Sequence, residues 1–106
     1  MTFSERYRRQ IDPDQALVAL RPAFMELGIR DVTAFTDALL FKIGAGSSTA
    51  WVDLSLNEWD LYDVEIFKVR SGKHRTLRVL DSIFWDDLAR LLIAEWCDYS
   101  TGTGGW

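Results

Sequence analysis

The sequence predicts an α+β fold: N-terminal helices, a small antiparallel β-sheet of about three strands, and a C-terminal amphipathic helix. Apolar residues recur every three to four positions before residue 44 and after residue 82, but alternate with polar residues from residue 51 onward. With 106 residues, 48% of them hydrophobic, the chain can bury a core without disulfides or metal. We expect one domain over residues 1–99 and a flexible, Gly-rich tail over residues 100–106.

Three helices are expected before residue 45. Thr2 followed by Glu5 matches a capping box and predicts a short first helix. The second begins at Asp12 and Pro13, a cap followed by a residue favoured at the first helical position, and ends at Gly28. Pro22 should kink this helix or divide it into two short ones.

The third helix is expected from Asp31, as its cap, to Gly44. Its predicted apolar stripe, at a spacing of three to four residues, consists of Val32, Phe35, Leu39 and Ile43. The run "VTAFTDALLFKI" could also be a strand, but the helical period and the closing glycine favour a helix.

A strand is predicted over residues 51–56, followed by a hairpin near residues 61–80. Ser71 and Gly72 suit a two-residue turn. That turn fixes a register that pairs Arg70 with Lys73, Lys68 with Arg75, Ile66 with Leu77, Val64 with Val79, Tyr62 with Asp81, and Glu65 with Arg78.

The last helix should be capped by Asp81 or Ser82. Its apolar face would hold Phe84, Trp85, Leu88, Leu91, Leu92 and Trp96. Glu95 projects to the middle of this face, so we expect it at the edge of the core with an Arg or hydroxyl partner.

The sheet face opposite the aliphatic stripe mixes aromatic and charged residues. It would show Trp51, Asp53, Ser55, Asp63, Glu65, Phe67, Val69, His74, Thr76, Arg78 and Leu80. Such a mixture is typical of a protein interface, with partial coverage by the N-terminal helices as the alternative.

No catalytic, metal or nucleotide motif is found. "GAGSST" lacks the lysine of a phosphate loop, and "DLSLNE" places Glu58 where a calcium loop needs glycine. His74, flanked by Lys73 and Arg75, suits a surface position, and one Cys with one His cannot make a zinc site alone. We therefore expect no enzyme activity, no cofactor and no metal.

The charge balance and the single cysteine bear on location and partners. Sixteen acids against twelve Lys and Arg give a net charge of −4, which disfavours nucleic acid and anionic membranes as partners. Cys97 cannot form an internal disulfide, and no signal or membrane-spanning run is visible, so a cytoplasmic protein is expected.

Two binding hypotheses follow from the opposed charge blocks. The first is a protein-binding inhibitor or adaptor that meets a basic partner through Asp53, Glu58, Trp59, Asp60 and Asp63. The alternative is a nucleic-acid-binding module that uses the hairpin tip at residues 68–75, with Lys68, Arg70, Lys73, His74 and Arg75. The net charge places this alternative second.

The chain also resembles, as a type, the small acidic anti-CRISPR proteins of phages and mobile elements. The likeness lies in its length, the acid block "DLSLNEWDLYDVE", the absence of catalytic motifs, and a second acidic set formed by Asp81, Asp86, Asp87, Glu95 and Asp98. It implies binding to a CRISPR effector subunit or nuclease in a bacterial cytoplasm, blocking target recognition or cleavage. No shared motif exists, so it implies no particular site residue.

Overall fold

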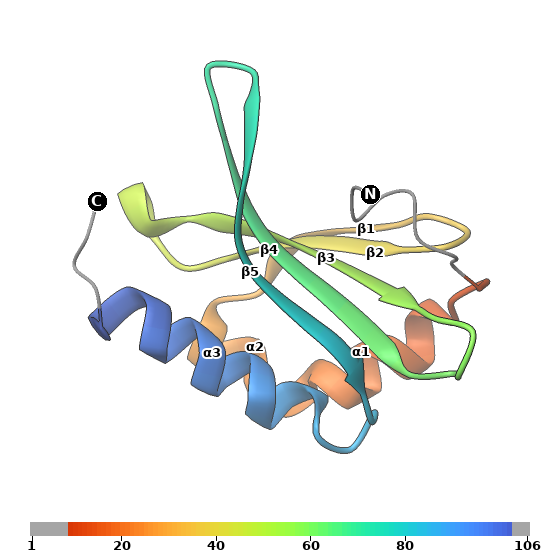
Figure 1. The fold of residues 1–106 in the computed structure, drawn as a ribbon. Helices are drawn as coiled ribbons and strands as arrows, with labels where there is room; N and C mark the ends of the chain where they lie inside the picture. The colour runs from red at the N-terminus through yellow and green to blue at the C-terminus, as the bar shows by residue number, and fades with distance from the viewer. Residues whose placement is uncertain (1–8, 103–106) are drawn as a thin grey trace.

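The chain folds into an antiparallel sheet with helices packed on one face (Figure 1). The computed structural model describes residues 9–102, with side chains through residue 99, so the helix expected near residues 2–7 lies outside the described residues. The α+β class is confirmed, but the sheet has five strands where about three were expected. They follow one another in chain order: β1 (Arg30–Ala34), β2 (Leu39–Ile43), β3 (Ala50–Leu56), β4 (Tyr62–Arg70) and β5 (Lys73–Ile83).

The helical segment after Asp12 forms as its local signals predict. The Asp12 carboxylate accepts hydrogen bonds from the backbone N–H groups of residues 14 and 15, at 3.0 and 3.4 Å, and caps α1 (Pro13–Leu20). Pro22 divides the segment into α1, a 3₁₀ turn (Arg21–Ala23) and α2 (Phe24–Leu27). Gly28 ends α2 with a left-handed φ of 64°.

The prediction of a helix from Asp31 to Gly44 is wrong, because this segment forms the β1–β2 hairpin. Leu39, Phe41 and Ile43 are fully buried and alternate with half-buried neighbours, which is a strand pattern. β2 pairs along its whole length with β3. The helical stripe was accidental: Phe35, one of its members, is 52% exposed.

The β4–β5 hairpin keeps its predicted turn but not its full register. Arg70 pairs with Lys73, and Lys68 with Arg75, as expected. One irregularity then shifts the ladder by one residue, and a second follows near Ser82, whose φ is 56°. The expected pairs are replaced by Ile66 with Arg78, Glu65 with Val79, Val64 with Leu80, and Tyr62 with Ile83.

The shift changes which residues of β5 face the helices. Val79 now lies opposite Glu65 on the outer face, by which we mean the face of the sheet away from the helices, and it is 45% exposed. Arg78 turns to the helical side, where its Nε lies 3.2 Å from the Glu95 carboxylate. The predicted arginine partner of Glu95 is therefore confirmed, whereas the predicted Glu65–Arg78 pair is wrong.

The C-terminal helix begins later than expected. β5 continues to Ile83, and α3 (Leu88–Gly102) begins after an exposed turn. Phe84 and Trp85, predicted on the apolar helix face, lie in this turn and are 61% and 56% exposed. Residues 100–102, expected in the tail, continue α3.

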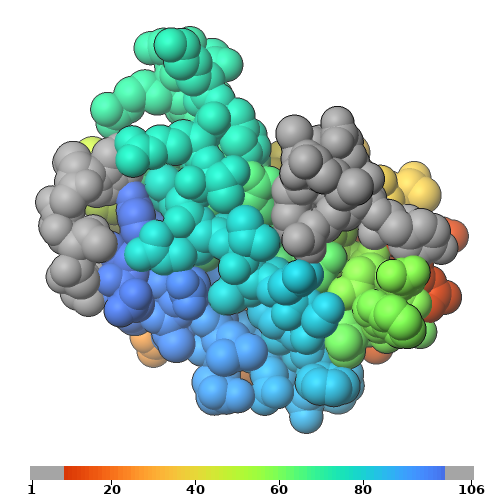
Figure 2. All heavy atoms as spheres, in the orientation of Figure 1, coloured from red at the N-terminus to blue at the C-terminus, as the bar shows by residue number. Residues whose placement is uncertain are grey.

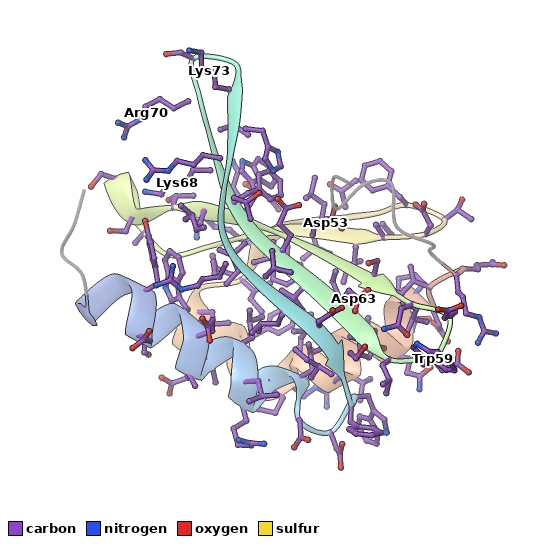
Figure 3. All side chains as sticks on the ribbon, viewed as in Figure 1. Asp53, Trp59, Asp63, Lys68, Arg70 and Lys73 are labelled. Carbon is purple, nitrogen blue, oxygen red and sulfur yellow. The ribbon has the colours of Figure 1, made fainter. Side chains whose placement is uncertain are left out.

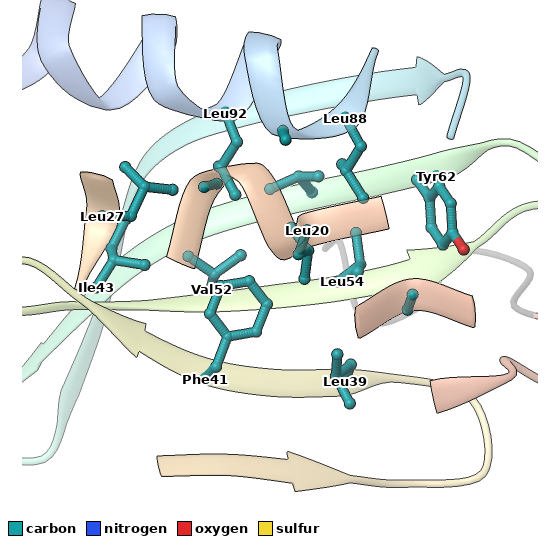
Figure 4. Close-up of a cluster of buried hydrophobic side chains, with 14 of the residues drawn as sticks. Leu20, Leu27, Leu39, Phe41, Ile43, Val52, Leu54, Tyr62, Leu88 and Leu92 are labelled. Carbon is teal, nitrogen blue, oxygen red and sulfur yellow. The ribbon is translucent and has the colours of Figure 1, made fainter. Parts of the chain in front are cut away.

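The core lies between the sheet and the helices (Figure 4). Leu20 from α1 and Leu92 from α3 meet the inner side chains of the sheet, such as Phe41 and Val52, and all four are fully buried. Since α1 and α2 lie on the same side as α3, the alternative in which they cover the outer face is wrong (Figure 1). Within residues 9–102, no helix combines the length and apolar character needed to cross a bilayer.

Candidate functional site

Exposed aromatic side chains gather at one end of the sheet. Trp59 lies in the β3–β4 turn and is 70% exposed, while Phe84 and Trp85 lie in the β5–α3 turn. Because Tyr62 pairs with Ile83, these two turns leave the sheet at the same end. Figure 2 shows them side by side on one face, green beside light blue. Exposed aromatics grouped in this way are typical of an interface.

The β3–β4 turn is held by a buried amide. Asn57 is 8% exposed, and its Oδ1 accepts hydrogen bonds from the backbone N–H groups of Trp59, at 2.8 Å, and Leu61, at 3.3 Å. Its Nδ2 donates to the Asp63 carboxylate at 3.1 Å and to the Ser82 hydroxyl at 3.0 Å. One side chain thus orders the Trp59 turn and joins it to the strand that leads to Trp85.

Carboxylates surround these aromatics. Glu58 and Asp60 flank Trp59, Asp86 follows Trp85, and all three acids are exposed. Asp60 forms an ion pair with Arg9 at the surface, so part of its charge is compensated. We call this surface the aromatic–acidic end and define it by Glu58, Trp59, Asp60, Phe84, Trp85 and Asp86.

Asp53 and Asp63, two of the predicted binding residues, do not belong to this end. Figure 3 shows them along the sheet, with Trp59 at the turn. Asp63 is 3% exposed and accepts a hydrogen bond from the Ser82 backbone N–H at 2.9 Å. Burial, and then the nearby Asp81, raise the pKa of the Asp63 carboxyl. Asp63 is therefore an internal connector between β4 and β5, and Asp53 is half-buried on β3.

The predicted nucleic-acid-binding residues lie in two different places. Lys68, Arg70 and Lys73 lie on the part of the hairpin that projects beyond the rest of the sheet (Figures 1 and 3), and Arg75 pairs with Lys68 across it. His74 instead lies against the outer face.

His74 belongs to a hydrogen-bonded cluster of side chains on the outer face. Its Nε2 is 2.7 Å from the carboxylate of Glu65, a residue that is only 5% exposed. The Thr76 hydroxyl donates to the same carboxylate oxygen. The His74 ring also stacks on Phe67, with ring centroids 4.3 Å apart. Through these contacts His74 ties the projecting part of the hairpin to the outer face of the sheet.

Phe84, Trp85 and Asp86 were missed as site residues because they were assigned to the last helix. The signal that could have found them is Asp87 directly before an apolar run, a helix-capping pattern. The Asp87 carbonyl accepts the hydrogen bond of the Leu91 N–H at 2.9 Å, which marks the true start of α3. A helix that is capped at Asp87 does not include Phe84 and Trp85.

No protein-family model matches this chain, and neither the curated proteins nor the solved structures contain one detectably similar to it. In the part of the chain that the structure describes, no three His, Cys, Asp or Glu side chains are grouped to hold a metal ion.

Proposed function

We propose that the protein is a non-enzymatic binding module whose aromatic–acidic end docks on a basic surface of another protein. The observation that carries this proposal is the grouping of Trp59, Phe84 and Trp85, each more than half exposed, on two adjoining turns. Leaving such side chains in water gives up the free energy of burying them, roughly 1.5–3 kcal/mol for a large apolar side chain.

The turns suit binding because they are already ordered. The hydrogen bonds of Asn57 fix the Trp59 turn in the free protein, so less conformational entropy is lost when a partner binds. Tryptophans in such positions are often the residues whose truncation costs most, about 2 kcal/mol or more each. The carboxylates around them would raise the association rate with a basic partner and select against an acidic one.

The partner class follows from the charge. A protein that handles nucleic acid has a basic path for phosphates, and a surface with aromatics and acids can occupy that path and inhibit it. A CRISPR effector subunit or nuclease is one such protein, and the resemblance in type makes it the partner to test first.

The experiment is affinity capture from bacterial lysate, followed by binding measurements with the purified partner. A variant with Glu58→Gln, Asp60→Asn and Asp86→Asn should lose most of the captured partner, and its association rate should depend less on salt. The matched control, Asp14→Asn with Glu26→Gln and Asp98→Asn, also removes three exposed acids, and all three lie on the helices. Equal capture by the two variants would remove the acids from the proposal.

A second candidate function has its own observation in favour. The basic hairpin projects beyond the sheet (Figure 1), as a β-ribbon that contacts phosphates would. Duplex and single-stranded nucleic acid should then bind more weakly as salt rises, and the salt slope should fall by about one for each phosphate contact removed.

A further inference from the structure

A pocket of about 280 Å³ lies where the β2–β3 connection meets the base of the hairpin. Three cationic side chains line it, together with two hydroxyl side chains and one indole. They are Lys42, Lys68 and Arg70, Ser47 and Thr49, and Trp51. Figure 3 shows the Lys68 and Arg70 side chains extending from the hairpin toward that connection. The pocket is thus at the opposite end of β4 from Trp59, and it does not depend on protein binding there.

The charged side chains among the described residues that line the pocket are all cations: Lys42, Lys68 and Arg70. Partial burial, and then repulsion by Arg70, lower the pKa of the Lys68 ammonium. An anion in the pocket would favour the protonated form of Lys68, since an opposite charge stabilises an ammonium.

The loop that forms the floor is tied down by hydrogen bonds. The Lys68 ammonium donates to the backbone carbonyl of Ser47 at 3.0 Å. The guanidinium of Arg30 donates to the Thr49 hydroxyl at 3.0 Å and to the Gly44 carbonyl at 2.6 Å. Because a hydroxyl accepts and donates at once, Thr49 can donate its own proton to an anion in the pocket.

The remaining wall combines a cation with an aromatic ring. The Lys42 ammonium lies 4.8 Å from the centroid of the Trp51 ring and 3.2 Å from the exposed Asp31 carboxylate. These two contacts position the ammonium at the pocket. The volume is close to the lower end of ligand sites, roughly 300 Å³, which suits a phosphate group with its sugar better than a large cofactor.

We propose that this pocket binds a phosphate group of a single-stranded nucleic acid, held by Lys68, Arg70 and the Thr49 hydroxyl, with Lys42 at its edge. The choice of nucleic acid rests on the second candidate function, because the adjoining hairpin can follow the next phosphates of a strand. Single strands fit better than duplex, since an open pocket beside a tryptophan admits one flexible backbone.

The test is a titration of the full chain followed by ¹⁵N–¹H NMR. One arm uses inorganic phosphate and the other an oligothymidylate of about ten nucleotides, a length within the usual site sizes of single-strand binders. Both should shift the amide resonances of residues 46–49 and 68–70. The oligonucleotide should bind more tightly, with an affinity that falls as salt rises.

Charge-matched variants separate a built pocket from diffuse attraction. Lys68→Gln and Lys73→Gln each remove one cation from the hairpin, but only Lys68 lines the pocket. Lys68→Gln should weaken oligonucleotide binding about tenfold, as loss of a charge-assisted hydrogen bond does. Lys73→Gln should weaken it by about threefold or less, as loss of an exposed charge does. The spectrum of each variant shows whether it is folded.

Two results would overturn the proposal. Equal weakening by the two variants would mean that the hairpin attracts phosphates without a pocket. Inorganic phosphate that binds as tightly as the oligonucleotide would assign the pocket to a free phosphate compound and not to nucleic acid. The acid variant of the aromatic–acidic end should keep the phosphate-induced shifts, so failure of the pocket and failure of the protein-binding proposal can be told apart.

Discussion

Replacement of Gly44 by alanine should destabilise the fold far more than replacement of Gly46. Both glycines have left-handed backbone angles, with φ of 79° and 57°, so alanine at either pays about 1 kcal/mol of backbone strain. A Cβ at residue 44 would lie 2.6 Å from the Ser48 carbonyl oxygen and 2.9 Å from the Trp96 ring, whereas at residue 46 it would meet nothing within 4 Å.

The difference between the two variants isolates that clash. Ser48 contributes a backbone atom that cannot rotate away, and forcing a group into packed structure costs roughly 1–3 kcal/mol. We therefore expect a loss of about 1 kcal/mol for Gly46→Ala and about 2–4 kcal/mol for Gly44→Ala. Urea unfolding followed by circular dichroism gives both values. Equal losses would refute the close approach of residue 44 to the Ser48 backbone and the Trp96 ring.

Two further changes test other parts of the fold. Asp12→Ala removes the α1 cap and should cost about 1 kcal/mol in the same urea assay, whereas Asp14→Ala, at the exposed second residue of α1, should cost clearly less. Asp63→Asn tests the buried connector. The pKa of the Asp63 carboxyl is raised in the folded protein, so protonation of Asp63 stabilises the fold. This stabilisation is fully present below the unfolded pKa of about 3.9 and is lost as the pH rises through the folded pKa. The asparagine variant, which keeps an acceptor for the Ser82 N–H, should lack this pH dependence, and a stability difference from wild type that is constant with pH would contradict it.

Sequence patterns predicted the elements whose signals are local. Asp12, Pro13 and Gly28 act on the backbone within a few residues, so the bounds of that helical segment could be read directly. The turn at Ser71 and Gly72 is equally local, and it was right. In both cases the residues that decide the structure are neighbours in the chain.

The failures involve partners far along the chain. Residues 39–43 are a strand because β3 supplies a pairing edge, and the helical spacing in that segment could not reveal it. At Leu77 the hairpin makes a choice of register: the one adopted packs Leu80 and Ile83 against the core and leaves Val79 exposed. Such a choice depends on the helices packed below the sheet.

The candidate site was predicted in part. Glu58, Trp59 and Asp60, three of the predicted binding residues, lie in the exposed β3–β4 turn. Counting acids along the chain could not tell that Asp63 is buried and joins two strands. Nor could it show that the β5–α3 turn brings Trp85 to the same end, because that depends on where α3 begins.

The central claim is that the aromatic–acidic end binds a protein partner, and the most direct test is the dissociation constant of the purified complex for two variants. Trp59→Ala combined with Trp85→Ala should raise this constant by about a thousandfold, since two truncated anchors at about 2 kcal/mol each cost about 4 kcal/mol together. The control is Met25→Ala on α2, which truncates a side chain that is 95% exposed and should leave the constant unchanged. A double variant that binds as tightly as the Met25→Ala control would contradict the claim.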